Sequence, residues 1–349
     1  MKLKTFLLFF LVFLVAAVLL IWKLQPAPEL DAAAYVPDTA LLYMEQDDVE
    51  GFLYDLSHSR LGRTVQSIDF VKIGKDLKLT EEKIDLIKKA DILIRDNWNS
   101  QIIKEIFGKK VAFALLQPLN SKPYASYADY FRDNSVVITR PGYKVEFMRL
   151  LAERYAVYRK DITISSHQYG NYHIKRISID DDVISAVAMG GFILISFEEG
   201  QLRKCIDTYD HELPSLAEEK DYSRLRDHYS HPDQYLFLGL GSIRNFITEH
   251  LALYEFSSRD IVEKELDGTA GFAGFSYGAW KNESLISDRI MVLYNREMVS
   301  GAVEQRLSTE PLVCDTMRFS PRDPLVFYWT NIVDFELLYQ LYIEKAGQR

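Results

Sequence analysis

The sequence has few of the features that usually identify a catalytic, metal-binding or nucleic-acid-binding protein. Its only two cysteines, Cys205 and Cys314, lie far apart and fit neither a zinc-ligand spacing nor a redox pair. A disulfide between them and two separate buried thiols both remain open interpretations. The net charge is −9, and no Lys/Arg cluster in the sequence offsets it locally. We therefore expect no nucleic-acid partner.

Patterns typical of hydrolases and calcium sites are also missing. Ser165-Ser166-His167 places hydroxyl groups beside an imidazole, but no Gly-x-Ser-x-Gly elbow surrounds either serine. Asp180-Asp181-Asp182 lacks the oxygen ligands that are spaced along an EF-hand loop, so we interpret it as a hairpin turn. Neither segment is predicted to be catalytic.

Two further segments contain side chains of the right type for a site. His228-Tyr229-Ser230-His231, between Asp227 and Asp233, is the densest metal-capable set, and we interpret it as a polar turn before Pro232. The second segment is a glycine run that contains Gly268, Gly271, Gly274 and Gly278. It lacks the strand-loop-helix context of a dinucleotide site. We interpret it as a strand whose glycines lie at bends or beneath large neighbours. The sequence thus predicts no catalytic residue, cofactor-binding residue, metal ligand or cofactor.

One long apolar segment is present near the N-terminus. Thr5 to Trp22 form 18 residues without a charge, which as a helix would span about 27 Å and cross a bilayer. Lys2 and Lys4 precede the segment, so the positive-inside rule predicts a cytoplasmic N-terminus. We predict a single-pass anchor in the inner (cytoplasmic) membrane, with the body in the periplasm or otherwise outside the cytoplasm.

A cleaved signal peptide, with Ala32-Ala33-Ala34 in its cleavage region, is the alternative to this anchor. No cysteine follows the apolar segment closely, which excludes lipoprotein processing. Both interpretations export the body.

A repeated opening organises the rest of the chain. Val36-Pro37-Asp38, His231-Pro232-Asp233 and Ser320-Pro321-Arg322-Asp323 each precede a short apolar strand and an amphipathic helix. Chance punctuation by proline is the alternative explanation. We predict an N-terminal transmembrane helix followed by tandem α+β units, divided into an anchor (1-24), a linker (25-34), a first unit (35-230), a shorter second unit (231-319) and the start of a third unit or a closing element (320-349).

Local patterns predict the elements of these units. Ala40 to Met44 should be a strand followed by a helix that Asp47 or Asp48 caps, and Ser242 should cap the helix after the second opening. The longest β pattern is a meander of antiparallel strands, separated by residues that tolerate tight turns. Its strands are expected at Ile162 to Ser166, Tyr172 to Ile179, Val183 to Met189 and Phe192 to Phe197.

Other local patterns predict further elements. We expect a capping box between Ser215 and Glu218 and a hairpin that turns at Lys281-Asn282. Two further strands are expected at Val111 to Leu116 and Ser135 to Thr139, and two further helices at Tyr143 to Tyr158 and near Val303 to Leu307.

A combination of features extends over most of Tyr35 to Arg349. It comprises the Pro-Asp opening, the strand pair at Val111 and Val136, the Tyr169-Gly170-Asn171 turn before a meander, the Ile193 to Ser196 strand with its helix through Ile206-Asp207, and Ser215-Leu216-Ala217 before Tyr222. This combination resembles a bacterial family of membrane-anchored, exported proteins that carries only a domain-of-unknown-function label. The resemblance implies export, an anchor and tandem α+β units, and it brings no catalytic residues.

Our main hypothesis is a non-enzymatic envelope protein that presents an interaction or scaffold surface to a protein partner. The membrane itself would be a second partner, through the N-terminal helix. The first alternative is a carrier of lipid or another apolar ligand, because the 21 Tyr and 20 Phe could line a groove. The second alternative is an exported hydrolase.

Overall fold

The computed structural model describes residues 31–81, 84–85, 87–88, 107, 109–120, 124, 126–141, 162–179, 182–251, 262, 266–267, 269–282 and 285–299. These residues form a mixed α+β structure with one ten-stranded antiparallel sheet, seven α-helices and two 3-10 helices. The predicted α+β class is confirmed. Among the described residues, no helix is long and apolar enough to span a membrane, and the predicted anchor at Thr5 to Trp22 lies outside them.

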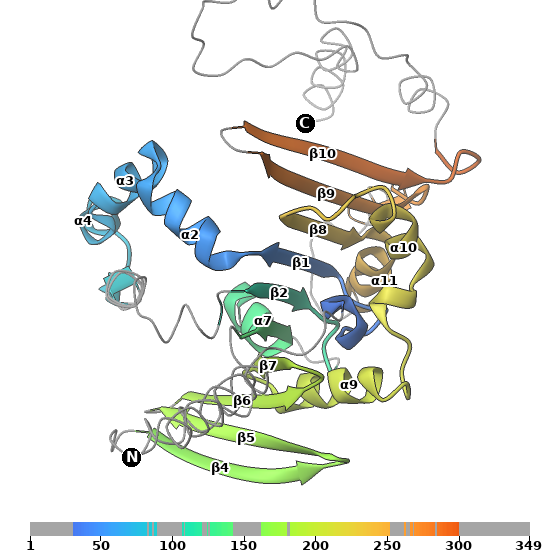
Figure 1. Ribbon diagram of the computed structural model, residues 1–349, viewed down its shortest axis with the longest axis horizontal. Coiled ribbons are helices and arrows are strands. Elements are labelled where there is room, and N and C mark those ends of the chain that lie inside the picture. Colours follow the sequence, from blue (N-terminus) through green and yellow to red (C-terminus); the bar gives the residue numbers. More distant parts are fainter. Residues whose placement is uncertain are drawn as a thin grey trace, which may run out of the picture. The chain divides into compact units, whose positions relative to one another are not determined.

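The strands follow the order β10-β9-β8-β1-β2-β3-β7-β6-β5-β4 in the sheet (Figure 1). β8 opens the predicted second unit, yet it pairs directly with β1, with Tyr235 opposite Glu45. Strands from both predicted units therefore share one sheet. By contacts, the chain divides into one compact unit of Met1–Arg259 with Ala273–Leu293 and another of Asp260–Phe272 with Tyr294–Arg349.

The chain enters the sheet through η1 (Ala32–Tyr35) and β1 (Leu42–Asp47). Asp31 caps η1 by accepting a hydrogen bond from the Ala33 amide at 2.9 Å. Three helices follow: α2 (Val49–His58), α3 (Arg60–Ser67) and α4 (Phe70–Asp76). The Asp48 carboxylate accepts from the Gly51 amide at 3.2 Å at the start of α2, which confirms Asp48 as the cap.

The chain returns through β2 (Lys110–Leu115), α7 (Tyr127–Asn134) and β3 (Ser135–Arg140). The predicted strands at Val111 and Ser135 are confirmed, and they pair antiparallel. Ser126 caps α7 by accepting from the Asp129 amide at 3.1 Å.

The predicted meander is confirmed as β4 (Ile162–Tyr169), β5 (Tyr172–Ile179), β6 (Asp182–Met189) and β7 (Phe192–Ser196). Gly170, Gly190 and Gly191 have φ angles of 54°, 55° and 89° at two of its turns. Residues with a Cβ atom adopt positive φ angles less readily, so glycine is favoured at these turns.

Helices from the next segment cover one face of the sheet. They are α9 (Glu199–Tyr209), η2 (Leu216–Glu218) and α10 (Lys220–Arg226). The predicted link between Ser215 and Glu218 is present, because the Ser215 amide donates to Glu218 Oε2 at 3.5 Å. The core between these helices and the sheet includes Tyr35, Tyr43, Ala112, Ala114, Val136, Ile138, Leu194, Leu202, Cys205, Ile206, Leu216, Tyr222, Leu225, Tyr235 and Phe237.

The last described elements are β8 (Gln234–Gly239), α11 (Leu240–Leu251), β9 (Phe272–Asn282) and β10 (Leu285–Tyr294). The prediction that Ser242 caps the helix was wrong, because α11 begins at Leu240, directly after β8. The predicted hairpin near Lys281-Asn282 is confirmed as β9 and β10. The smaller compact unit has few described residues; in it the Asn295 amide donates to the Gly271 carbonyl at 2.7 Å.

Several predicted elements lie outside the described residues. These are the anchor and most of the linker, the helix predicted at 143–158, the helix predicted near 303–307 and the third opening with its strand and helix at 320–349.

Candidate functional site

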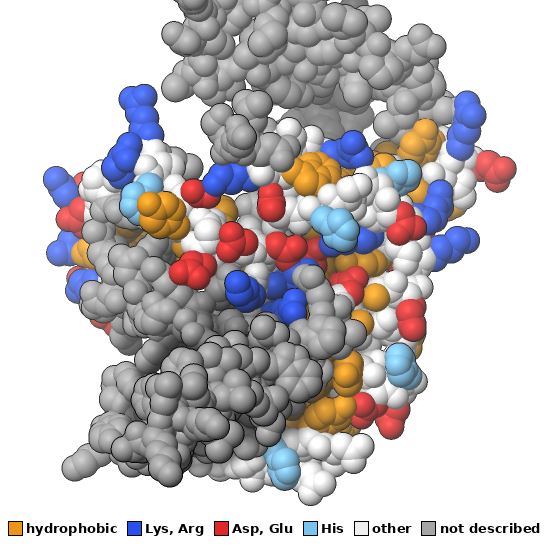
Figure 2. Space-filling view, in the orientation of Figure 1, with side chains coloured by type: hydrophobic (Ala, Val, Ile, Leu, Met, Phe, Trp, Pro, Cys, Tyr) orange, Lys and Arg blue, Asp and Glu red, His pale blue; other side chains and the backbone are white. Residues whose placement is uncertain are grey.

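A charged cluster lies within the helix-covered face of the sheet. Glu45 is on β1, where its neighbours on β2 and β8 are Ala112 and Tyr235. Its Oε1 accepts from Arg226 Nη2 of α10 at 2.5 Å, and Lys110 Nζ of β2 lies 3.7 Å from Oε2. Lys110 also lies 3.0 Å from Asp47 Oδ1. We call these four residues, Glu45, Asp47, Lys110 and Arg226, the Glu45 cluster. Figure 2 shows charged side chains over the ends of β1 and β2.

Tyrosines surround the Glu45 cluster. The Tyr43 hydroxyl donates to Glu45 Oε2 at 2.9 Å, and the Arg226 guanidinium lies 4.6 Å from the Tyr235 ring centre. Tyr222 packs edge-to-face against both Tyr43 and Tyr235. Burial holds the pKa values of all three tyrosines well above the ordinary value of 10.0.

Burial also shifts the pKa values of the charged groups. Burial raises the pKa of Glu45, although Lys110 and Arg226 act in the opposite direction. Burial alone would lower the pKa of Lys110, but the Glu45 and Asp47 carboxylates outweigh it and raise that pKa. Both oxygens of Glu45 are engaged by donors of the protein itself. The cluster therefore joins β1, β2 and α10 and does not offer a free reactive carboxylate.

A second charged group lies where β4 meets α9. His167 Nε2 is 3.0 Å from Glu199 Oε1, and Arg203 Nη2 donates to the same oxygen at 2.6 Å. Although burial raises the pKa of Glu199, its hydrogen bond from Arg203 and the nearby His167 outweigh burial and lower that pKa. Among the described contacts, none joins His167 to Ser165 or Ser166, so the imidazole is oriented by an acid without an adjacent nucleophile.

Two tyrosines extend this contact along the helix. The Tyr169 hydroxyl donates to Asp207 Oδ1 at 3.0 Å, and the Tyr172 hydroxyl donates to Asp210 Oδ1 at 2.8 Å. Burial and the bond to Asp210 raise the pKa of Tyr172 to about 12. The β4–β5 hairpin is thus held to α9 by polar contacts.

The histidine-rich turn also has a structural role. Asp233 Oδ2 accepts from the Lys281 amide at 2.6 Å, and the His228 carbonyl accepts from Arg289 Nη1 at 2.7 Å. His231 has a φ of 45°, as in a tight turn. The part of the chain that the structure describes contains no group of three or more His, Cys, Asp or Glu that could hold a metal ion.

The remaining sequence candidates are strand and turn residues. Asp182 starts β6 and lies opposite Ile179, while Asp180 and Asp181 are outside the described residues. Gly278 of β9 lies beneath Tyr229: a Cβ atom there would be 2.3 Å from Tyr229 Cδ1. The interpretation of this run as a strand with glycines beneath large neighbours is confirmed at Gly278, and Gly268 lies outside the described residues.

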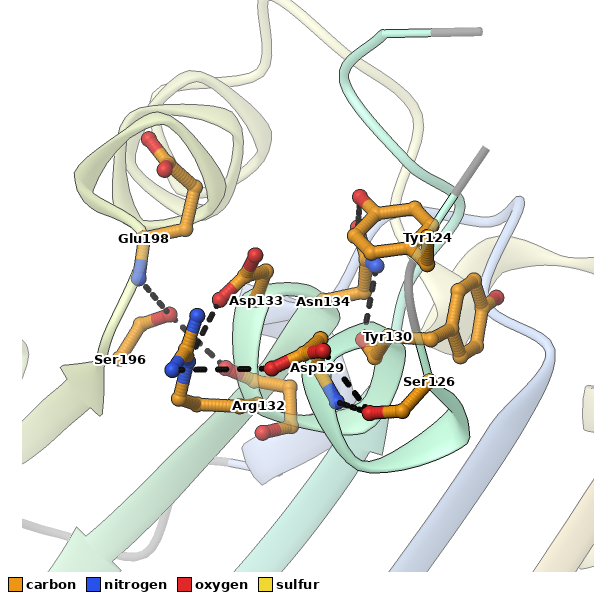
Figure 3. Close-up of polar contacts among 10 residues, drawn as sticks. Tyr124, Ser126, Asp129, Tyr130, Arg132, Asp133, Asn134, Ser196 and Glu198 are labelled. Carbon is orange, nitrogen blue, oxygen red and sulfur yellow. Dashed lines mark hydrogen bonds and ion pairs between the residues drawn. The ribbon is translucent and has the colours of Figure 1, made fainter. Parts of the chain in front are cut away.

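A polar network joins the ends of α7, β7 and α9. Asn134 is almost fully buried; its amide donates to the Tyr130 carbonyl at 2.8 Å and its oxygen accepts from Gln201 Nε2 at 3.0 Å. In Figure 3, the Glu198 amide donates to the Ser196 hydroxyl at 3.2 Å, and this hydroxyl donates to the Ser135 carbonyl at 2.8 Å. The bonds to the Tyr130 carbonyl and from the Glu198 amide satisfy backbone groups at element ends, which is a structural task.

The second face of the sheet is apolar as well. Side chains that lie directly opposite one another form a row across β3, β2, β1, β8 and β9, namely Val137, Phe113, Met44, Leu236 and Tyr277. Four of them are partly exposed, and Met44 is 43% exposed although β1 lies in the interior of the sheet. Beyond β9, Met291 and Leu293 of β10 pack on the core, so Ile290 and Val292 point to the opposite side, where Ile290 is 62% exposed.

This apolar row departs from the usual pattern of an antiparallel sheet. An antiparallel sheet that is open on one face usually alternates apolar residues on the core side with polar residues on the open side. Here both sides of the central strands are apolar, and the second side is partly accessible. Such a surface is suited to bind an apolar surface or ligand.

Neither the Glu45 cluster nor the apolar row was predicted from the sequence. The signal for the first is a carboxylate at an inward position of β1, where Glu45 follows Tyr43 by two residues. The signal for the second is the near-continuous apolar character of β2, β3 and β8. Comparison with protein families, with curated proteins and with solved structures finds no match to this chain.

Proposed function

We propose that this chain is a non-enzymatic, membrane-anchored envelope protein that presents an interaction surface outside the cytoplasm. In this proposal Thr5 to Trp22 form a single transmembrane helix, and tandem α+β units follow it. The partner is another envelope protein, bound through the apolar row.

The exposure of Met44 carries the proposal. A central strand is normally the best covered part of a sheet, so a methionine there with 43% of its surface exposed indicates an opening in the covering layer. The cross-strand neighbours Phe113 and Leu236 make the opening apolar. Methionine is also adaptable, and it is common on surfaces that bind proteins.

The charged groups support a binding role more than a chemical one. Glu45 is engaged by Arg226 and Tyr43, and His167 is engaged by Glu199. Each group is occupied in joining a helix to the sheet.

Photo-crosslinking in native membranes tests the proposal. Benzoylphenylalanine placed at Met44 or at Ile290 should yield one discrete protein adduct that mass spectrometry identifies. The same group at Lys220, an exposed position at the start of the opposite α10 helix, is the control and should yield none. Alkaline carbonate extraction of the full chain should leave it in the membrane pellet.

A charge introduced on the apolar row gives a second measurement. Met44→Lys should abolish the adduct formed from position 290, because a buried lysine would be unpaired in the complex. It should leave the urea midpoint of the free protein nearly unchanged, since the exposed Met44 contributes little to the core. Adducts with lipid alone would favour the carrier, and self-adducts alone or no adducts would reject the scaffold.

A further inference from the structure

The short helix α4 exposes an apolar stripe. Phe70, Ile73 and Leu77 follow the i, i+3, i+7 spacing that places side chains on one side of a helix. All three are exposed, and Leu77, at the C-cap, is the most exposed at 68%. Leaving three large apolar side chains together in water is unfavourable, so the stripe requires an explanation.

The stripe borders the part of α4 that packs on the protein, because Gly74 lies four residues after Phe70 and three before Leu77. Gly74 is the buried residue of this helix, and a Cβ there would meet Ile87 Cδ1 at 3.2 Å and Ile84 Cγ1 at 3.7 Å. This contact already docks α4 onto the residues that follow it. Beside that contact, Ile73 and Leu77 remain exposed.

Positive charge accompanies the stripe. Between Ser59 and Leu79 the chain has five basic and two acidic residues, a net of +3 in a protein whose net charge is −9. The basic residues are Arg60 and Arg63 on α3, Lys72 and Lys75 on α4, and Lys78 just after it. Figure 2 shows basic side chains gathered over α3 and α4 at the left of the view. This segment is an exception to the expectation that no Lys/Arg cluster offsets the net charge locally; its basic residues are spaced apart and form no continuous run in the sequence.

We propose that α3 and α4 seat on the anionic surface of the membrane that holds the N-terminal anchor. The stripe would enter the boundary between headgroups and acyl chains, and the basic residues would contact anionic headgroups. The inference rests on the proposed anchoring, because a body tethered by a short linker stays near the bilayer. A seated helix would fix the orientation of the body and hence the direction in which the apolar row faces.

Crosslinking to lipid tests this inference in the full chain. Benzoylphenylalanine replaces Leu77 in one variant and Phe197, a 43% exposed residue after β7, in the control. After illumination in native membranes, position 77 should form adducts with phospholipid and position 197 should form none. A protein adduct at position 77 would show that the stripe binds a protein partner. The absence of any adduct would show that the stripe does not contact the bilayer. Either result overturns the inference.

The electrostatic part has its own readout. In nanodiscs that carry the full chain, the yield of the lipid adduct at position 77 should fall at least fivefold when anionic lipid is replaced by zwitterionic lipid. The double variant Lys72→Gln/Lys75→Gln should lower it similarly in anionic nanodiscs. An unchanged yield in both experiments would contradict seating on anionic lipid. Alkaline carbonate extraction tests the anchor separately from the seating of α4. A chain that carbonate extracts would reject the anchor. A chain that stays in the membrane but forms no lipid adduct would reject only the seating of α4.

Discussion

Removing the charge of Glu45 tests whether the Glu45 cluster stabilises the fold. Glu45→Gln keeps the shape of the side chain but places an amide where Arg226 Nη2 now lies 2.5 Å from Oε1. Removing one partner of a buried ion pair costs about 3–5 kcal/mol. In the variant, Lys110 would still pair with Asp47 at 3.0 Å, and Arg226 is partly exposed. We therefore expect a loss of stability at the lower limit of this range, about 3 kcal/mol.

Urea unfolding of the full chain in detergent measures this loss. With a slope of about 3 kcal/mol per molar urea, the midpoint should fall by about 1 M. Glu212→Gln, a change of the same type on an exposed turn after α9, should leave the midpoint unchanged. A loss below about 0.5 kcal/mol for Glu45→Gln would refute the reasoning, since it would mean that solvent replaces the lost charge.

A double variant tests whether Glu45 and Arg226 stabilise the fold as an ion pair. Glu45→Met/Arg226→Met removes both charges and fills the space with apolar atoms, so its stability should lie within about 1 kcal/mol of the parent or above it. If the double variant is instead less stable than Glu45→Gln, the two residues do not act mainly as an ion pair.

Three further predictions follow from packing and burial. Gly278→Ala should cost about 1–3 kcal/mol in urea unfolding because its Cβ would meet Tyr229 at 2.3 Å, whereas Gly241→Ala on α11, where the nearest atom is 4.0 Å away, should leave stability unchanged or raise it. Cys205 is a fully buried free thiol whose pKa burial raises to about 12, so peptide mapping should find it unmodified by a thiol reagent until the protein unfolds. The buried tyrosines around the Glu45 cluster have folded-state pKa values above the unfolded value of 10.0. Their contribution to the stability of the fold is therefore complete below pH 10 and is lost as the pH rises further. Absorbance at 295 nm should show that they ionise as the protein unfolds, and ionisation before unfolding would contradict their burial.

The sequence predicted the local elements well where short-range chemistry determines them. The meander from Ile162 to Ser196 was found because its strands alternate and its turns contain Gly170, Gly190 and Gly191. The start of α11 was missed because Leu240 continues directly from β8 and a plausible capping serine follows at Ser242. Capping preferences alone do not identify a helix that begins without a side-chain cap.

The pairing of strands was not predictable to the same degree. β1 lies between β2 and β8, and the second of these partners begins almost 190 residues after β1. No local pattern specifies such a pairing, since many apolar strands could fit beside Leu42 to Asp47. The two similar openings were identified from the sequence, but their adjacency in one sheet was not.

The same long range concealed the candidate sites. Glu45, Lys110 and Arg226 come from three separate regions, and each alone has the appearance of an ordinary charged residue of a mixed chain. Met44 next to Glu45 illustrates the two outcomes on one strand. The charged side chain points into the covered face and is buried by partners from β2 and α10, while the apolar side chain points to the other face and is left partly in water. At these two positions of β1 the polarity is therefore reversed relative to an ordinary half-exposed strand, in which Met44 would be buried and Glu45 exposed. Such a reversal costs free energy unless the buried charge is paired within the fold and the apolar face is covered by a partner, so a binding partner for the apolar row is the condition that would account for this strand.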